Sequence, residues 1–192
     1  MEELNLEELI AQIKDSDDKV RAAAWLSAGK YGAVAVKPLA SVMTDEDVEI
    51  ARAAKRALWV IVRWVGRPGA EDDKRAVEAA LCGLLGSDEP DAVRCEVLWM
   101  LSEIGGDEAV AAVREIPGIL YDKRLREDAR CAVQRIPGDA ALETLQGGFD
   151  AAPEDFRPAI AESLRDRGVE VDGYPSQKLV PTKKTDVQPV SQ

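Results

Sequence analysis

The sequence predicts an all-α protein, an α-α superhelix (solenoid) of about five helical hairpins. Three observations predict this fold. A helical pattern of apolar residues recurs about every 31 residues, glycines follow most of the copies as helix stops, and a shorter helical segment lies between successive copies. Because a single hairpin cannot bury its apolar face alone, neighbouring hairpins are expected to stack around one continuous core.

The first 16 residues are expected to form an N-terminal capping helix. Leu6, Leu9, Ile10 and Ile13 have helical spacing in an acidic, amphipathic segment, which suits a helix that closes one end of a repeat array. The segment lacks the basic start and the apolar run of a signal peptide, and nowhere do 18 apolar residues follow one another. We therefore expect a cytoplasmic protein without membrane contact.

The repeat array is expected to span residues 17–172. Each copy starts with an apolar residue, defined here as position zero, and has small or apolar residues at +4, +7 and +8. The register predicts that residues at zero and +4, such as Val93 and Val97, are buried between hairpins. The spacings between copies are 30, 43, 32 and 31 residues, so one insertion is expected, around residues 62–74. The zero positions are Val20, Ile50, Val93, Leu125 and Phe156.

A second, shorter helix is expected after each of the first four copies, where apolar residues again have helical spacing. These helices are predicted over residues 34–43, 74–85, 107–115 and 139–146. No such pattern follows the fifth copy. Residues 173–192 are rich in Pro, Ser, Thr and Gln without helical periodicity, which predicts a flexible C-terminal tail.

The repeat itself resembles a known family. Three copies are DDKVRAAAWLSAGKYG, EPDAVRCEVLWMLSEIGG and DKRLREDARCAVQRIPG. Their acidic start, the V-R or L-R pair and the closing glycine resemble the HEAT-like repeats of the phycobilisome-lyase (PBS lyase) type, over residues 18–168. Some members of that family help to attach bilin chromophores to phycobiliproteins. The resemblance therefore implies, as an alternative function, a lyase-like or chaperone-like accessory subunit.

Two polar residue types recur with the repeat, and we interpret both as structural. An aspartate precedes most of the helices, where a carboxylate accepts hydrogen bonds from free backbone amides and favours the positive end of the helix dipole. An arginine follows the zero position in four copies, and these arginines are expected to pair with the acids along the stack. The residues are Asp17 or Asp18, Asp47, Asp91 and Asp122, and Arg21, Arg94, Arg126 and Arg157.

Composition excludes several classes of function. The chain has 25 Lys and Arg against 36 Asp and Glu, a net charge of −11, so the average surface repels nucleic acid. It has no histidine, which excludes Ser-His-Asp and Cys-His catalysis and histidine-ligated metals. We therefore predict no enzymatic activity, no cofactor and no metal site.

Serine and cysteine chemistry is also not expected. Ser27-Ala-Gly-Lys30 matches S-x-x-K, but Ser27 occupies the +7 column of the repeat and is interpreted as a small packing residue. Three cysteines, an odd number without a C-x-x-C pair, argue against disulfides and a thiolate metal site. Cys82, Cys95 and Cys131 are each expected to be buried as apolar residues.

The tryptophans provide the candidate binding site. Trp25 and Trp99 are expected to be half-buried between repeats. Trp64 lies where the second copy's helix continues past the usual stop, between Arg63 and Arg67. Trp and Arg are common at the centres of protein interfaces, so Arg63, Trp64 and Arg67 are predicted to bind a partner. In the alternative, Trp64 covers the edge of the stack and the arginines neutralise nearby acids.

Architecture and composition together favour a non-catalytic protein–protein interaction scaffold built from HEAT-like repeats. Repeat stacks bind through extended surfaces, and no catalytic constellation is present in the sequence. The expected partner is another protein, with no nucleic acid and no membrane. The identity of that protein and the oligomeric state do not follow from the sequence.

Overall fold

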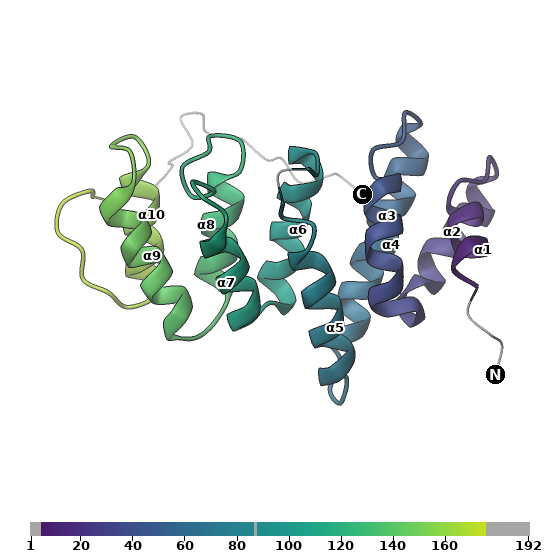
Figure 1. Cartoon of the computed structure of the whole chain (residues 1–192), viewed down its shortest axis with the longest axis horizontal. Coiled ribbons are helices and arrows are strands. Elements are labelled where there is room, and N and C mark those ends of the chain that lie inside the picture. Colours follow the sequence, from purple (N-terminus) through teal and green to yellow (C-terminus); the bar gives the residue numbers. More distant parts are fainter. Residues whose placement is uncertain (1–4, 87, 176–192) are drawn as a thin grey trace, which may run out of the picture.

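The computed structural model describes residues 5–86 and 88–175. Within these residues the chain forms ten α-helices and one 3₁₀ helix, η1, and no β-strand. The helices follow one another along a single axis in the order of the chain (Figure 1). The predicted all-α solenoid is therefore confirmed.

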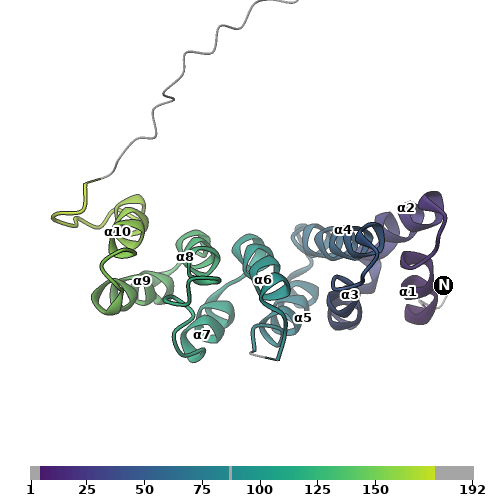
Figure 2. The ribbon, with the colours of Figure 1, turned by 90° about the horizontal axis from the view of Figure 1, so that it is seen from above.

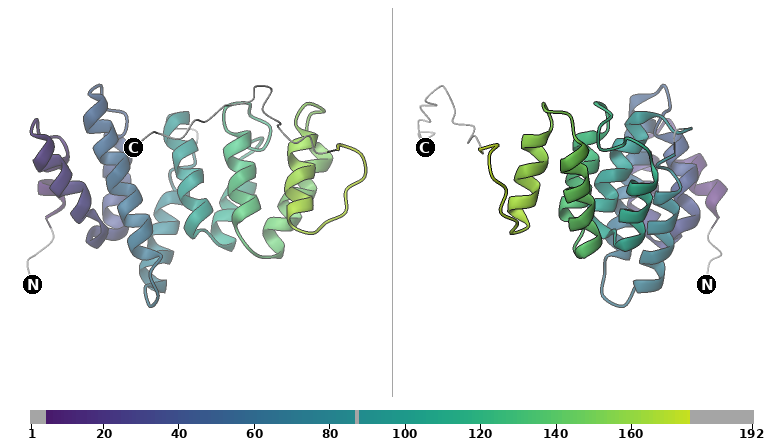
Figure 3. Two further views of the ribbon diagram at one scale, coloured as in Figure 1. Left: turned by 180° about the vertical axis from the view of Figure 1, so that it is seen from behind. Right: turned by 60° about the vertical axis from the view of Figure 1, so that its left-hand side comes forward.

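The helices form two layers. The first layer contains the helix that opens each predicted copy, and its members stand side by side in Figure 3. It consists of α2 (Asp18–Ser27), α4 (Val48–Val65), α6 (Asp91–Ile104), α8 (Arg126–Arg135) and α10 (Arg157–Asp166). The second layer consists of α1 (Leu6–Ile13), α3 (Val36–Val42), α5 (Glu71–Cys82), α7 (Asp107–Glu115) and α9 (Asp139–Ala151). Figure 2 shows that the stack curves gently, with the first layer on the inner side.

The second-layer helices agree with the sequence pattern to within a few residues, and the differences have local causes. Helix α7 has the predicted ends. Helix α5 begins earlier than predicted, because residues 71–73 are acidic and favour the first turn of a helix. The segment predicted from residue 34 is divided: η1 (Ala28–Ala35) includes Gly32 at a φ of 57°, and α3 begins only after it.

The repeat register describes the core correctly at +4 but only in part at position zero. Residues at +4 are all at most 1% exposed. At position zero Val93, Leu125 and Phe156 are buried, whereas Val20 and Ile50 are only partly buried. Four of the five +4 residues are Ala or Val, which lets neighbouring helices approach closely. These +4 residues are Ala24, Ala54, Val97, Ala129 and Ile160. One apolar core therefore runs through the whole stack.

Two predictions about small residues are corrected. Ser27 is exposed rather than packed, because α2 ends at this residue and the chain turns into η1. Its counterpart Ser163, inside α10, is buried as the column predicts. Cys82, Cys95 and Cys131 are free thiols that are partly rather than fully buried.

Each helix packs mainly on its nearest neighbours in the stack. In the first layer α2 contacts α4, and α8 contacts both α6 and α10. In the second layer α7 contacts both α5 and α9. At the N-terminal end α1 packs on α2 with Leu9 and Ile13 buried, and Asn5 caps it by accepting a hydrogen bond from the Glu8 amide at 3.1 Å. Within the described residues, no helix is long and apolar enough to cross a membrane.

At the C-terminal end the described chain turns back onto the last hairpin. Tyr174 packs edge-to-face on Phe149, with ring centroids 5.6 Å apart. Arg165 donates hydrogen bonds to the carbonyl groups of Gly173 and Tyr174, at 2.7 and 2.8 Å. Most of the tail predicted over residues 173–192 lies outside the described residues, which end at residue 175.

Candidate partner-binding surface

Helix α4 is the longest helix of the described chain, with 18 residues against 14 in α6. Its N-cap residue is Asp47, whose carboxylate accepts a hydrogen bond from the Glu49 amide at 2.8 Å. It continues to Val65 because Ile61, Val62 and Val65 prolong the buried spacing, and it ends at a Gly-Arg-Pro-Gly turn. Of the predicted partner-binding residues, Arg63 and Trp64 lie in the last turn of α4 and Arg67 lies in the turn that follows it.

Trp64 packs against η1 and Arg67 while the residue remains 48% exposed. Its Cβ and Cγ lie against Gly29 of η1, so closely that a Cβ added at Gly29 would be 2.9 Å from both atoms. The Arg67 guanidinium lies over the indole, 4.6 Å from the ring centroid, and Nη1 of Arg67 donates to the Trp64 carbonyl at 2.7 Å. Arg67 also forms an ion pair with Asp73 at 3.2 Å. The structure therefore brings Trp64 and Arg67 together.

Arg63 lies apart from that pair. Its guanidinium is over the ring of Trp59, 5.9 Å from the centroid. Residues four apart share one face of a helix, whereas adjacent residues are rotated by about 100° from each other. The three predicted site residues thus form two separate units, Trp64 with Arg67 and Arg63 with Trp59.

The second unit belongs to a basic face of α4, which we call the α4 stripe. Lys55 forms an ion pair with Glu96 of α6 at 2.6 Å, and the Trp59 ring nitrogen donates to the same carboxylate at 2.5 Å. On the other side the Arg56 guanidinium lies over the Trp25 ring of α2, at 5.7 Å. The stripe lines a groove of 490 Å³ and consists of Arg52, Lys55, Arg56, Trp59 and Arg63.

Sequence reasoning missed most of this stripe, although a signal was present. Arg52, Arg56, Trp59 and Arg63 are spaced three, four or seven residues apart along one helical face, and Lys55 lies at its edge. The departure from the repeat period lies at the end of α4, so the period indicated that end of the helix and not its exposed face. The contact between Trp64 and Gly29 had no comparable signal, because it depends on how η1 packs on α4.

Further contacts join repeats along the first layer. The Trp99 ring nitrogen donates to Asp128 of α8 at 2.7 Å, and Trp99 is 38% exposed. Arg126 forms an ion pair with Asp155 at 2.9 Å, which lowers the pKa of that carboxyl, and lies 4.5 Å from the Phe156 ring centroid. Trp25 is half-buried, as predicted.

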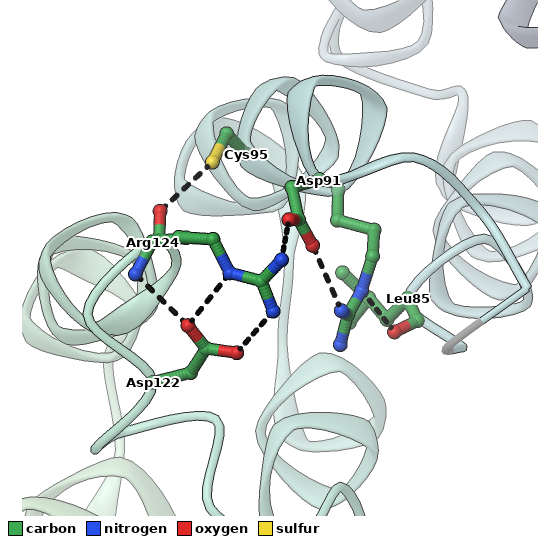
Figure 4. Close-up of polar contacts among 6 residues, drawn as sticks. Leu85, Asp91, Cys95, Asp122 and Arg124 are labelled. Atoms are coloured by element: carbon green, nitrogen blue, oxygen red, sulfur yellow. Dashed lines mark hydrogen bonds and ion pairs between the residues drawn. The ribbon is translucent and has the colours of Figure 1, made fainter.

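The start of α6 shows how the recurrent acids and arginines are used (Figure 4). The Asp91 carboxylate contacts Arg124 at 2.6 Å and Arg94 at 3.4 Å. Asp122 accepts hydrogen bonds from the side chain and the backbone amide of Arg124, which lower the pKa of its carboxyl. Arg94 is 7% exposed and donates to the Leu85 carbonyl at 2.9 Å. These contacts join segments of successive repeats.

The expected pairing of arginines with acids holds only in part. Arg94 and Arg126 contact aspartates, as described above. Arg21 instead donates to the Asp15 carbonyl at 2.6 Å, and Arg157 donates to the Ala152 carbonyl at 3.0 Å. These two arginines satisfy carbonyl groups of the loop before their own helix.

In residues 5–86 and 88–175, no group of three or more His, Cys, Asp or Glu side chains is placed to hold a metal ion.

Comparisons with known proteins give limited information. No protein-family model matches the chain, and no curated protein matches it significantly. The engineered protein of Northeast Structural Genomics Consortium target OR329 is similar at 22% identity, with a TM-score of 0.44, over 85% of this chain and 79% of that chain. A designed armadillo repeat protein is similar at 12% identity, with a TM-score of 0.30, over 84% of this chain and 99% of that chain.

These likenesses are too weak to carry an argument about function. The helical repeat architecture follows from the helices and the register described above. The narrower resemblance to PBS lyase HEAT-like repeats stays a prediction from the sequence.

Proposed function

We propose that this protein is a non-catalytic protein–protein interaction scaffold and that the end of α4 contacts its partner. The proposal depends on one observation. Trp64 is 48% exposed on the longest helix of the described chain, stacked under Arg67 and outside the buried columns of the repeat. Tryptophan and arginine are the side chains most enriched among the residues that dominate binding energy at protein interfaces.

The immediate surroundings of Trp64 suit a binding residue. Gly29 supports one edge of the side chain and Arg67 covers one face, so the indole is held in place before a partner arrives. Ordering a side chain at an interface costs free energy, and a ring that is already positioned avoids most of that cost. Arg67 adds a charged group beside the ring, although Asp73 already neutralises part of that charge.

Affinity purification tests the proposal. The wild-type chain, Trp64→Ala and Val48→Ala are each immobilised, and the retained proteins are identified by mass spectrometry. Val48 is a matched control, because it is 56% exposed at the opposite end of α4, about 24 Å along the helix. We expect one protein that wild type and Val48→Ala retain and Trp64→Ala loses.

Two results would contradict the proposal in different ways. If no protein is retained above the bare matrix, the scaffold function is wrong. If a protein is retained equally by wild type and Trp64→Ala, the scaffold function stands but Trp64 is not its contact.

The lyase-like or chaperone-like alternative depends on the sequence resemblance alone. Coexpression with a phycobiliprotein subunit and a bilin tests it, because a covalent adduct gives visible absorbance. We place the proposed scaffold in the cytoplasm, which the distribution of a fluorescent fusion protein would test.

A further inference from the structure

The α4 stripe concentrates positive charge on a protein whose net charge is −11. Arg52 and Lys55 are already neutralised, by Glu49 at 2.6 Å and by Glu96 at 2.6 Å. Arg56 and Arg63 are exposed, and within the described residues neither has a carboxylate partner. Their contacts are with the rings of Trp25 and Trp59. Two guanidinium groups are therefore available for an anion.

These two arginines have a defined geometry. Arg56 and Arg63 are seven residues apart on α4, which places them on the same face about 10 Å apart along the helix. Trp59 lies between them and is half-buried in the groove of 490 Å³. Its ring nitrogen is fixed by the hydrogen bond to Glu96 at 2.5 Å. The result is an apolar surface with a cation at each end.

We infer that the α4 stripe binds an acidic segment of the partner protein. Two carboxylates of that segment pair with Arg56 and Arg63, and an apolar side chain between them covers Trp59. Arginine suits this role because its planar group can bind a carboxylate through two parallel hydrogen bonds. The inference rests on the proposed scaffold function and adds the chemistry of the partner.

Charge complementarity favours an acidic peptide over other occupants. A nucleic acid carries a charge about every 1.7 Å along its axis, so it would extend beyond the stripe onto a protein that is acidic overall. A peptide can place carboxylates only where the two arginines lie. The chain's own residues 173–192 contain three lysines and one aspartate, so they have the wrong sign for this surface.

A direct binding experiment uses a fluorescein-labelled peptide, Glu-Asp-Glu-Leu-Glu-Asp-Glu, and its Gln/Asn counterpart. Fluorescence anisotropy is measured with wild type, with Arg56→Glu/Arg63→Glu, and with the control Arg75→Glu/Arg114→Glu. The control changes the net charge equally but alters exposed arginines of the second layer. Circular dichroism and thermal melting of each variant show whether it is folded. Arg56→Lys/Arg63→Lys keeps the charge without the planar group.

We expect the acidic peptide to bind wild type and the control, and the Gln/Asn peptide to bind neither. Arg56→Glu/Arg63→Glu should weaken binding by about tenfold or more, while the lysine variant should retain part of it. Failure of the acidic peptide to bind overturns the inference, as does an equal loss in the control. Tighter binding of a labelled thymidine oligonucleotide at the same ionic strength also overturns it, since phosphate would then be the favoured anion.

The same variants separate this inference from the proposed function. If a partner is captured in the affinity purification, lost by Trp64→Ala and retained by Arg56→Glu/Arg63→Glu, the scaffold function stands and the acidic segment is wrong. If no partner is captured by wild type, the scaffold function itself fails, whatever the peptide does.

Discussion

Glu78 illustrates how a single residue joins two repeats. It lies on α5 and is 6% exposed, yet its Oε1 accepts hydrogen bonds from the Gly106 amide at 2.6 Å and from the Ala109 amide at 3.1 Å. These amides belong to the start of α7, where Gly106 has no side chain to cap the helix. A carboxylate from the preceding repeat therefore performs the capping.

Removing this acceptor should destabilise the protein. We expect Glu78→Ala to reduce the free energy of unfolding by about 2 kcal/mol, because one buried and one partly buried amide lose their partner. Glu78→Gln keeps a carbonyl acceptor and should lose less. Urea denaturation measures both, with Glu143→Ala on exposed α9 surface as the control. Equal midpoints for Glu78→Ala and wild type would show that the cap contributes nothing.

The thiols of Cys82 and Cys95 are expected to be unreactive in the folded protein. Burial, reinforced by the nearby Glu78 and Glu108 charges, raises the pKa of Cys82 to about 12. Burial and Asp128 likewise raise the pKa of Cys95 to about 12. Only the thiolate reacts with iodoacetamide, so at pH 8 both thiols should be alkylated much more slowly in the native chain than in urea. Mass spectrometry of peptides measures this, and equal rates in the two conditions would contradict the account.

Among elements, the contact between η1 and α4 requires glycine at position 29. A methyl group there would meet Trp64 at 2.9 Å, so Gly29→Ala should cost about 1–3 kcal/mol and change the tryptophan fluorescence. Gly147 of α9 is a suitable comparison, because a Cβ at that position meets nothing within 4 Å. Gly147→Ala should be neutral or stabilising. If thermal melting shows the two variants to be equally stable, the close contact at Gly29 is absent.

The helices themselves could be predicted from the sequence because the repeat period shows them several times. The column at +4 identified buried residues correctly from α2 to α10. The separation of Arg63 from Trp64 also follows from helical geometry alone, once the residues are known to lie within α4. The capping of α7 by Glu78 could not be predicted, because it depends on the distance between two second-layer helices that no local pattern encodes.

The whole molecule is an open stack, and its overall dimensions follow from that. A compact protein of this length has a radius of gyration of about 16 Å. We expect small-angle X-ray scattering to give a clearly larger value for the described part of the chain. A variant ending at residue 175 should be measured beside the full chain, so that residues 176–192 do not determine the result. A radius near that of a compact protein would contradict the two-layer arrangement of Figure 2.

In an open stack each helix is stabilised mainly by contacts with its neighbours. An exposed side chain can therefore bind a partner while contributing little to the stability of the fold. The central claim is that Trp64 serves binding. The most direct measurement compares wild type and Trp64→Ala in thermal melting and in affinity for the purified partner. The account predicts nearly unchanged melting and a loss of about 2 kcal/mol or more in binding free energy. A large loss of thermal stability with intact binding would contradict it and show that Trp64 is a packing residue.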